Sequence, residues 1–212
     1  MMPHVKPLML ALLLAATAGC LFTRAESRPV HTYQLSPDAQ FPGIEARGTN
    51  KTGPILLVGL PQPDPGFDTR RMVYVTRPYE LNYYSANEWA DTPGRMLCPL
   101  LIRALEHTGL WQAVIAAPSL LRPDYRVDLN GLVLAQEFIQ SPSRVRISWR
   151  VQLIDLREGR VLGTRRFDVV REAPSEDAYG GVEAANQVLG ELLNGTVSWL
   201  GACVADRGKA AC

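Results

Sequence analysis

The stretch Arg144-Val-Arg-Ile-Ser-Trp-Arg-Val-Gln-Leu153 decides the fold, because polar and apolar side chains alternate along it without interruption. Alternation with a period of two predicts a β-strand that has one buried face and one wet face. The residues expected on the buried face are Val145, Ile147, Trp149, Val151 and Leu153.

Turn residues flank this stretch at Ser141-Pro142-Ser143 and at Glu158-Gly159. Strands that are joined by short turns pair in the antiparallel direction. The sequence therefore predicts an antiparallel meander over residues 125–140, 144–156 and 160–171.

Shorter strands are predicted before the meander. Residues 30–35 alternate as an edge strand would, and residues 55–60 form an unbroken apolar run, as expected for a central strand that is buried on both faces. Residues 72–75 and 80–84 predict a hairpin, and residues 111–116 predict one further short strand.

Two amphipathic helices are predicted. The first begins at Asp91-Thr92-Pro93, where an N-cap residue precedes a proline at the first helical position, and it ends near Gly109. Pro99 lies inside this helix, and it either kinks the helix or marks its true start. The second helix spans about residues 179–200. The fold class we predict is α+β, a two-layer sandwich of a mostly antiparallel sheet with both amphipathic helices packed on one face.

The first residues predict export and anchoring. Lys6 precedes an apolar run that ends in small residues and Cys20, and this run is shorter than the roughly 20 residues that span a bilayer. The pattern resembles the lipobox of bacterial lipoproteins, so we expect a signal peptide over residues 1–19 and lipidation of Cys20. The alternatives are an ordinary secretory signal that is cleaved near Ala18, or an uncleaved membrane anchor.

The rest of the chain is long enough for one domain with a sizeable core. We expect a lipidated tether over residues 20–29, a folded domain over residues 30–204 and a flexible tail over residues 205–212. The 22 Lys and Arg residues nearly balance the 21 Asp and Glu residues, so charge does not favour nucleic acid as a partner. Cys203 and Cys212 could form a disulfide, which would leave Cys98 as a buried free thiol.

Chemical motifs are absent from the sequence. It has no metal-binding spacing of His, Cys, Asp or Glu, and no motif of covalent hydrolysis or of phosphate binding. His107 is expected to interact with the carbonyl groups at the end of the first helix. The sequence thus predicts no catalytic residue, no metal site and no cofactor.

Two groups of side chains are candidates for a partner interface. The aromatic cluster is Tyr74, Tyr79, Tyr83, Tyr84 and Trp89, and the candidates for the interface are Tyr83, Tyr84 and Trp89. Tyr and Trp dominate interface energies, although these side chains could instead pack in the core under the first helix. The basic group is Arg144, Arg146 and Arg150, on the predicted wet face. These arginines could meet an acidic partner or lipid headgroups, or they could form a solvated face that discourages edge-to-edge pairing.

Several segments, taken in order, resemble a known family. They are Cys20, the stretch His31-Thr32-Tyr33-Gln34-Leu35-Ser36-Pro37, the stretch Leu81-Asn82-Tyr83-Tyr84, and the block Glu88-Trp89-Ala90-Asp91-Thr92-Pro93 that opens a leucine-rich helix. This order, which continues to Trp199-Leu200 in the last helix, is similar to that of the ABC-type transport auxiliary lipoproteins, of which the Pqi-type lipoprotein is the best-known kind.

The resemblance implies a non-catalytic component of an MCE-type lipid transport system across the periplasm. Its implied partners are an MCE-domain protein and inner-membrane transporter components. Leu21 follows the cysteine where Asp would retain the lipoprotein in the inner membrane, so we expect an outer-membrane anchor with the domain facing the periplasm. A homo-oligomer is also conceivable, since a lipid path needs an enclosed apolar passage. The competing hypotheses are an envelope-assembly or structural lipoprotein that binds peptidoglycan or an outer-membrane barrel, and a lipoprotein hydrolase without a recognisable motif.

Overall fold

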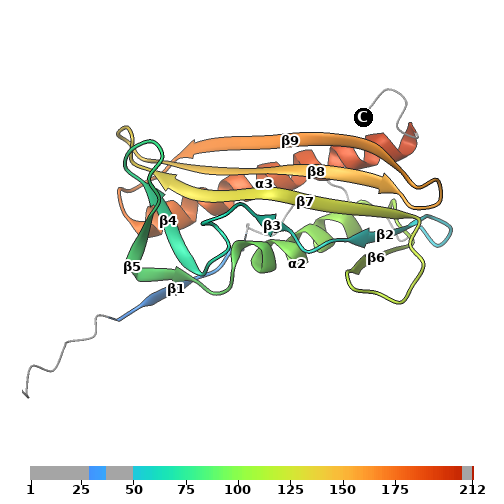
Figure 1. The fold of residues 1–212 in the computed structure, drawn as a ribbon, viewed down its shortest axis with the longest axis horizontal. Coiled ribbons are helices and arrows are strands. Elements are labelled where there is room, and N and C mark those ends of the chain that lie inside the picture. The colour runs from blue at the N-terminus through green and yellow to red at the C-terminus, as the bar shows by residue number, and fades with distance from the viewer. Residues whose placement is uncertain (1–28, 37–49, 207–211) are drawn as a thin grey trace, which may run out of the picture.

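The computed structural model describes residues 29–36, 50–206 and 212. Within these residues the chain forms one nine-stranded sheet and two helices (Figure 1). The elements in chain order are β1 (His31–Tyr33), β2 (Ile55–Val58), β3 (Gln62–Pro63), β4 (Arg71–Val75), β5 (Asn82–Trp89), α2 (Pro93–Glu106), β6 (Ala113–Ala116), β7 (Tyr125–Glu137), β8 (Arg144–Asp155), β9 (Arg160–Glu172) and α3 (Ala178–Ala205).

The long strands β7, β8 and β9 form the predicted antiparallel meander. They run along the long axis of the molecule, and α3 runs along the same axis behind them in Figure 1. The five apolar residues of the alternating stretch in β8 are all buried, as predicted. Trp149 is 1% exposed, and its indole Nε1 donates a hydrogen bond to Thr196 Oγ1 of α3 at 3.1 Å. The alternation in β8 therefore identifies the face of the sheet that packs against α3.

The remaining strands join the meander through parallel pairings. One edge of β7 pairs with β8, and the other edge pairs in succession with β2, β3 and β4, all of them parallel to it. A parallel pair needs a crossover connection, and the chain between β2 and β7 provides one because it passes through α2. The sheet is thus mostly antiparallel, as predicted, and partly parallel; the prediction did not specify which strands pair in parallel.

The shorter predicted strands are present with small changes of length. β1 lies at an edge of the sheet, where it pairs only with β5 among the described strands, and β4 and β5 form an antiparallel pair. β2 lies between β6 and β7. Leu56 and Val58 are buried while Ile55 and Leu57 are only half-buried, so the prediction of burial on both faces is right for one face only.

Both predicted helices are present. α2 begins with Pro93 at its first position and continues through Pro99, so Pro99 lies in its interior and does not mark the start. Gly109, just beyond the helix, has a φ of 61°, a conformation that glycine adopts readily. α3 extends five residues beyond the predicted end at Leu200. By length and composition alone α3 could span a membrane, but half of its most apolar window is buried against the rest of the fold, as in a core helix.

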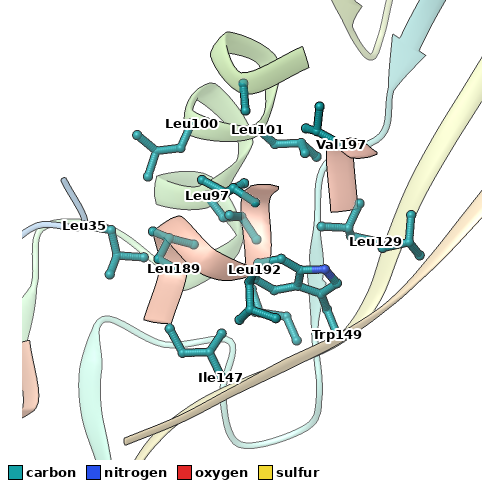
Figure 2. Close-up of a cluster of buried hydrophobic side chains, with 14 of the residues drawn as sticks. Leu35, Leu97, Leu100, Leu101, Leu129, Ile147, Trp149, Leu189, Leu192 and Val197 are labelled. Carbon is teal, nitrogen blue, oxygen red and sulfur yellow. The ribbon is translucent and has the colours of Figure 1, made fainter. Parts of the chain in front are cut away.

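The core lies where the two helices meet each other and the sheet. Figure 2 shows side chains that converge from α2, α3 and β8, among them Leu97, Leu101, Leu189, Leu192, Ile147 and Trp149. Several of these side chains have no more than 1% of their surface exposed, so this cluster supplies much of the hydrophobic stabilisation. The packing of the domain in two layers stays a prediction.

Three predicted features lie wholly or partly outside the described residues. These are the signal peptide over residues 1–19, Cys20 with most of the tether over residues 20–29, and much of the tail over residues 205–212. Cys212 is described, and the structure joins it to Cys203, with 5.3 Å between the two Cα atoms. Cys98 is a free and half-buried thiol, and burial raises its pKa, which suits an unreactive cysteine.

Candidate functional site

Tyr83 and Arg146 lie on the same face of the sheet although they come from distant parts of the sequence. The register pairs Tyr83 with Val73, Val73 with Ala135, and Ala135 with Arg146, so the four residues form one row across β5, β4, β7 and β8. This is the face that points away from the helices, because its arginines on β8 alternate with the buried apolar residues; its smaller side chains Val73, Ala135 and Ser148 are buried too. We call it the outer face. It brings one member of the aromatic cluster together with the basic group.

Trp89 does not belong to this face, and its inclusion among the interface candidates was wrong. Its side chain is 3% exposed and packs in the core beside Met72 and Leu134. The cause is a register shift between β4 and β5: Arg71 pairs with Glu88, whereas Val73 pairs with Tyr83. Because of this shift Glu88 shares the outer face with Tyr83 and Trp89 points to the opposite side.

Tyr84 also points to the helix side of the sheet. Its hydroxyl donates a hydrogen bond to Gln136 Oε1 at 3.0 Å, and its ring contacts that of Tyr74 with centroids 4.8 Å apart. Burial raises the pKa of Tyr84 to about 12, and the nearby Tyr74, Asp177 and Glu176 add to the effect. Tyr84 is therefore a structural hydrogen-bond donor, and Tyr83 is the aromatic candidate that remains on the outer face.

The three candidate arginines differ in their partners. Arg146 binds both neighbouring strands, with Nε 2.7 Å from Glu137 Oε1 and Nη1 2.9 Å from Asp168 Oδ1. The pKa of Arg146 is raised, first by its hydrogen bond to Glu137. Arg144 lies 3.6 Å from Glu172. Both arginines form ion pairs with neighbouring strands, as expected for a solvated face whose charges are paired within the sheet.

Arg150 has a different environment. It is exposed and pairs across the ladder with Arg166 of β9 on one side and with Asn130 of β7 on the other. Within the described part of the chain Arg150 has no ion pair, and Arg166 has only a 3.7 Å contact with Asp168. Like charges that are directly opposite on neighbouring strands are destabilising. Arg150 and Arg166 thus form a basic spot that Asp168 neutralises only in part and that could receive an acidic group.

A polar hollow of about 430 Å³ lies near the turn between β8 and β9. It is lined by Tyr125, Asp155, Arg157, Glu158, Arg160 and Val204. Its acids are paired: Asp155 lies 3.5 Å from Arg157, and Glu158 lies 2.5 Å from Arg160. Burial alone would raise the pKa of Asp155. Hydrogen bonds from the backbone of Glu158 and Arg157 and from the Arg157 side chain outweigh burial and hold this pKa below its usual value. The acids of this hollow are therefore held in ion pairs with Arg157 and Arg160.

Among the described residues, no three His, Cys, Asp or Glu side chains come together as metal ligands would. His107 lies at the end of α2 with its ring Nδ1 2.7 Å from the Arg103 carbonyl oxygen, so its predicted contact with helix-terminal carbonyls is confirmed.

Exposed apolar side chains lie at the two ends of the molecule, and only Tyr79 among them belongs to the aromatic cluster identified in the sequence. At one end lie Tyr79, Leu81, Ile139 and Tyr179, and at the other lie Leu120 and Leu121 in the loop between β6 and β7. Figure 1 shows these loops at opposite ends of the long axis. Periodicity could not find them because they belong to turns and element ends, where no repeating pattern applies.

The fold itself is shared with solved structures. The crystal structure of a protein from Xanthomonas campestris, of the family DUF330, is 23% identical and aligns with a TM-score of 0.73, covering 84% of this chain and 98% of that chain. A second crystal structure, of an uncharacterized protein, is 16% identical with a TM-score of 0.60, covering 82% of this chain and 99% of that chain. No curated protein matches the sequence. This chain therefore shares the α+β fold of these two structures.

The family follows from the sequence match. Residues 33–195 match the family described as the ABC-type transport auxiliary lipoprotein component. The chain belongs to this family of ABC-type transport auxiliary lipoproteins, and the resemblance that was seen in the sequence is confirmed. As an auxiliary component of ABC-type transport it has transporter components as partners, and its family is one of envelope lipoproteins.

Proposed function

We propose that this chain is the outer-membrane-anchored docking component of an MCE-type lipid transport system, and that it carries out no reaction of its own. The family match over residues 33–195 is the observation that carries this proposal. An auxiliary component acts by binding other components of the transport system. The partners in this proposal are an MCE-domain protein and inner-membrane transporter components.

The anchor in this proposal is Cys20, lipidated after removal of residues 1–19. Leu21 favours sorting to the outer membrane, with the domain facing the periplasm. Two or more acyl chains hold a protein firmly, because each buried CH₂ contributes about 0.8 kcal/mol. The domain would then meet its partner while it stays on its own membrane.

The docking surface in this proposal is the outer face around Tyr83, Arg150 and Arg166. The Arg150 and Arg166 pair leaves positive charge that Asp168 neutralises only in part. Tyr83 offers a half-buried ring, with the Arg71 guanidinium 4.2 Å from its centroid. Tyr and Arg are the residue types that most often dominate interface energies. Charge of this sign fits a partner segment rich in Asp and Glu.

Purification of the acylated protein from membranes tests the proposal. The expected result is recovery of an MCE-domain protein with the wild-type chain, and reduced recovery with an R150E R166E double variant. The matched control is Arg144→Glu, which reverses a charge on the same face of the same strand. Recovery of an outer-membrane barrel or of cell-wall fragments without an MCE-domain protein would contradict the proposal and favour the envelope-assembly alternative.

A further inference from the structure

Four exposed apolar side chains gather at the end of the molecule that carries β1 and the start of α3. We call this group the apolar tip: Tyr79, Leu81, Ile139 and Tyr179, which are 107%, 38%, 55% and 56% exposed. They come from the loop between β4 and β5, from the turn between β7 and β8, and from the first turn of α3. Figure 1 shows these three segments at the same end of the long axis, with β1 at that end as well.

Hydrogen bonds join the three segments into one structural unit. The Phe138 N–H donates to the Val75 carbonyl oxygen at 2.7 Å, which ties the β7–β8 turn to the end of β4. The Ser143 N–H donates to Glu176 Oε1 at 3.0 Å, which ties the same turn to the segment before α3. The apolar tip is therefore presented on a connected surface.

Tyr79 has a backbone conformation that packing within the fold does not explain. Its φ is 68°, in the left-handed region that a bulky residue seldom adopts, and its side chain is fully exposed. Arg77 and Glu80, which form an ion pair, flank Tyr79 in the loop. The loop thus holds an aromatic ring outward at a conformational cost that no contact of that ring repays.

The start of the described chain lies at the same end. Tyr33 of β1 contacts Tyr179 of the apolar tip, with ring centroids 6.3 Å apart. Cys20 precedes Pro29, the first described residue, by nine positions, and a chain of that length spans at most about 30 Å. Acyl chains on Cys20 would therefore bring this end of the domain, rather than the Leu120 end, next to the bilayer.

The two arginines near the apolar tip are paired: Arg77 pairs with Glu80, and Arg144 lies 3.6 Å from Glu172. The nearby acids Glu176 and Asp177 accept hydrogen bonds, at 3.0 Å from the Ser143 N–H and at 2.8 Å from the Gly180 N–H. These arginines therefore do not favour an acidic protein partner. Tyrosine rings, which combine an apolar body with a polar hydroxyl, suit the boundary between headgroups and acyl chains.

We propose that the apolar tip inserts into the surface of the bilayer to which Cys20 is anchored, so that the domain stands upright on its membrane. This inference rests on the proposed function, because it takes Cys20 as the anchor. In this orientation the long strands point away from the membrane and Leu120 lies at the far end.

Quenching of tryptophan fluorescence by brominated lipid tests this orientation. Full-length acylated protein is reconstituted into vesicles of phosphatidylcholine with brominated acyl chains, as the variants Tyr79→Trp, Ile139→Trp and Leu120→Trp. All three positions are exposed, so the substitutions do not disturb the core. We expect a loss of the added emission for the first two variants relative to unbrominated vesicles, and no loss for Leu120→Trp, which is the matched control.

The possible outcomes test the upright orientation and the anchoring by Cys20 separately. Equal quenching at all three positions, or at none, in protein that floats with the vesicles would overturn the upright orientation and leave the anchor intact. Flotation of the Cys20→Ala variant to the same extent as the acylated chain would overturn the anchor itself. Protection of Tyr79→Trp only after addition of a partner protein would show that the apolar tip is a protein contact and would also overturn the inference.

Discussion

Gln136 of β7 connects Tyr84 of β5 to the turn before β8 through two side-chain hydrogen bonds. It is 3% exposed, accepts from the Tyr84 hydroxyl at 3.0 Å and donates from Nε2 to Ser143 Oγ at 3.0 Å. A buried amide that loses one partner keeps the desolvation cost of the unpaired atom. The substitution Tyr84→Phe should therefore lower the free energy of unfolding by about 1–2 kcal/mol. Urea denaturation of both proteins at neutral pH measures the difference, and an unchanged midpoint would contradict this role of Tyr84.

Tyr84 should also make stability depend on pH in the alkaline range. Its pKa rises from 10.0 to about 12 in the folded protein, mainly through burial, so the folded state favours the protonated phenol. A group whose pKa is raised on folding contributes stability that is complete below the unfolded pKa and is lost as pH rises through the folded pKa. The stability of the wild-type chain should thus fall between about pH 10 and 12 relative to Tyr84→Phe. Parallel alkaline curves for the two proteins would refute this assignment.

Two glycines of α3 should respond in opposite ways to alanine. A Cβ on Gly181 would lie 2.4 Å from Gln136 Oε1, whereas a Cβ on Gly190 would meet nothing within 4 Å. Overpacking of this kind costs about 1–3 kcal/mol, so Gly181→Ala should be destabilising. Gly190→Ala should stabilise by about 0.5–1 kcal/mol because alanine restricts the unfolded chain. Thermal unfolding of the two variants measures these changes in stability. If both substitutions stabilise, or both destabilise, the space around Gly181 is not the controlling factor.

Single residues were the hardest scale to predict from the sequence. Trp89 was placed on an interface because aromatic type says nothing about the register shift that turns its side chain into the core. Tyr79 was not singled out as exposed, since its position depends on a loop conformation with positive φ. Arg146 was placed correctly on the wet face. Its two acidic partners were not predicted, because Glu137 and Asp168 lie 9 and 22 residues away in the sequence, on the neighbouring strands.

Strand β8 carries two arginines that should affect stability differently. Arg146 binds Glu137 and Asp168, so Arg146→Gln should lower the free energy of unfolding by about 0.5–1 kcal/mol, allowing for solvent screening. Arg150 faces Arg166, so Arg150→Gln should raise the free energy of unfolding by a few tenths of a kcal/mol, up to about 1 kcal/mol. Urea denaturation at low and high salt measures both effects, which should shrink as salt increases. A destabilising effect of Arg150→Gln would show that this arginine supports the fold and would weaken its assignment to a partner.

At the scale of elements, the sequence predicted most of what forms locally. The alternation and turns around β8 predicted the meander, and the proline at the start of α2 and the glycine beyond its end predicted that helix. The parallel pairing of β2, β3 and β4 along one edge of β7 was not predicted. Such pairings join segments that are far apart in the chain, and no local pattern records which edge they choose.

The whole molecule is an elongated domain whose two ends have different roles in our account. Strand β8 has 12 residues, which span about 40 Å at the rise of an extended strand. An upright domain would therefore hold its far end about 40 Å from the lipid surface and leave the outer face open to a partner along its length.

Removal of the anchor should separate folding from function. The variant Cys20→Ala should yield a folded, soluble protein, because the core of α2, α3 and the sheet does not depend on the leader. It should no longer support envelope integrity, since the docking surface would not be held at the membrane. Fractionation, circular dichroism and a detergent-sensitivity assay measure these properties together. Full envelope integrity with a soluble Cys20→Ala protein would contradict the anchoring account.

Function was predictable from the order of segments rather than from any chemical motif. The resemblance, which was stated for segments from Cys20 to Trp199-Leu200, is confirmed as family membership by the match over residues 33–195. The outer face, by contrast, became visible only when the register aligned Tyr83 with Arg146. No single strand identifies this surface. The four strands that form the row, β5, β4, β7 and β8, are separated in the sequence by a helix and several loops.

Photo-crosslinking in intact cells tests most directly whether the outer face is the docking surface. A photoreactive amino acid replaces Tyr83 or Arg150 in the acylated chain, and Glu183, an exposed residue of α3, is the control position. Our account predicts that the first two positions capture an MCE-domain protein and that the position of Glu183 does not. Capture of an outer-membrane barrel alone, or no dependence on position, would contradict it.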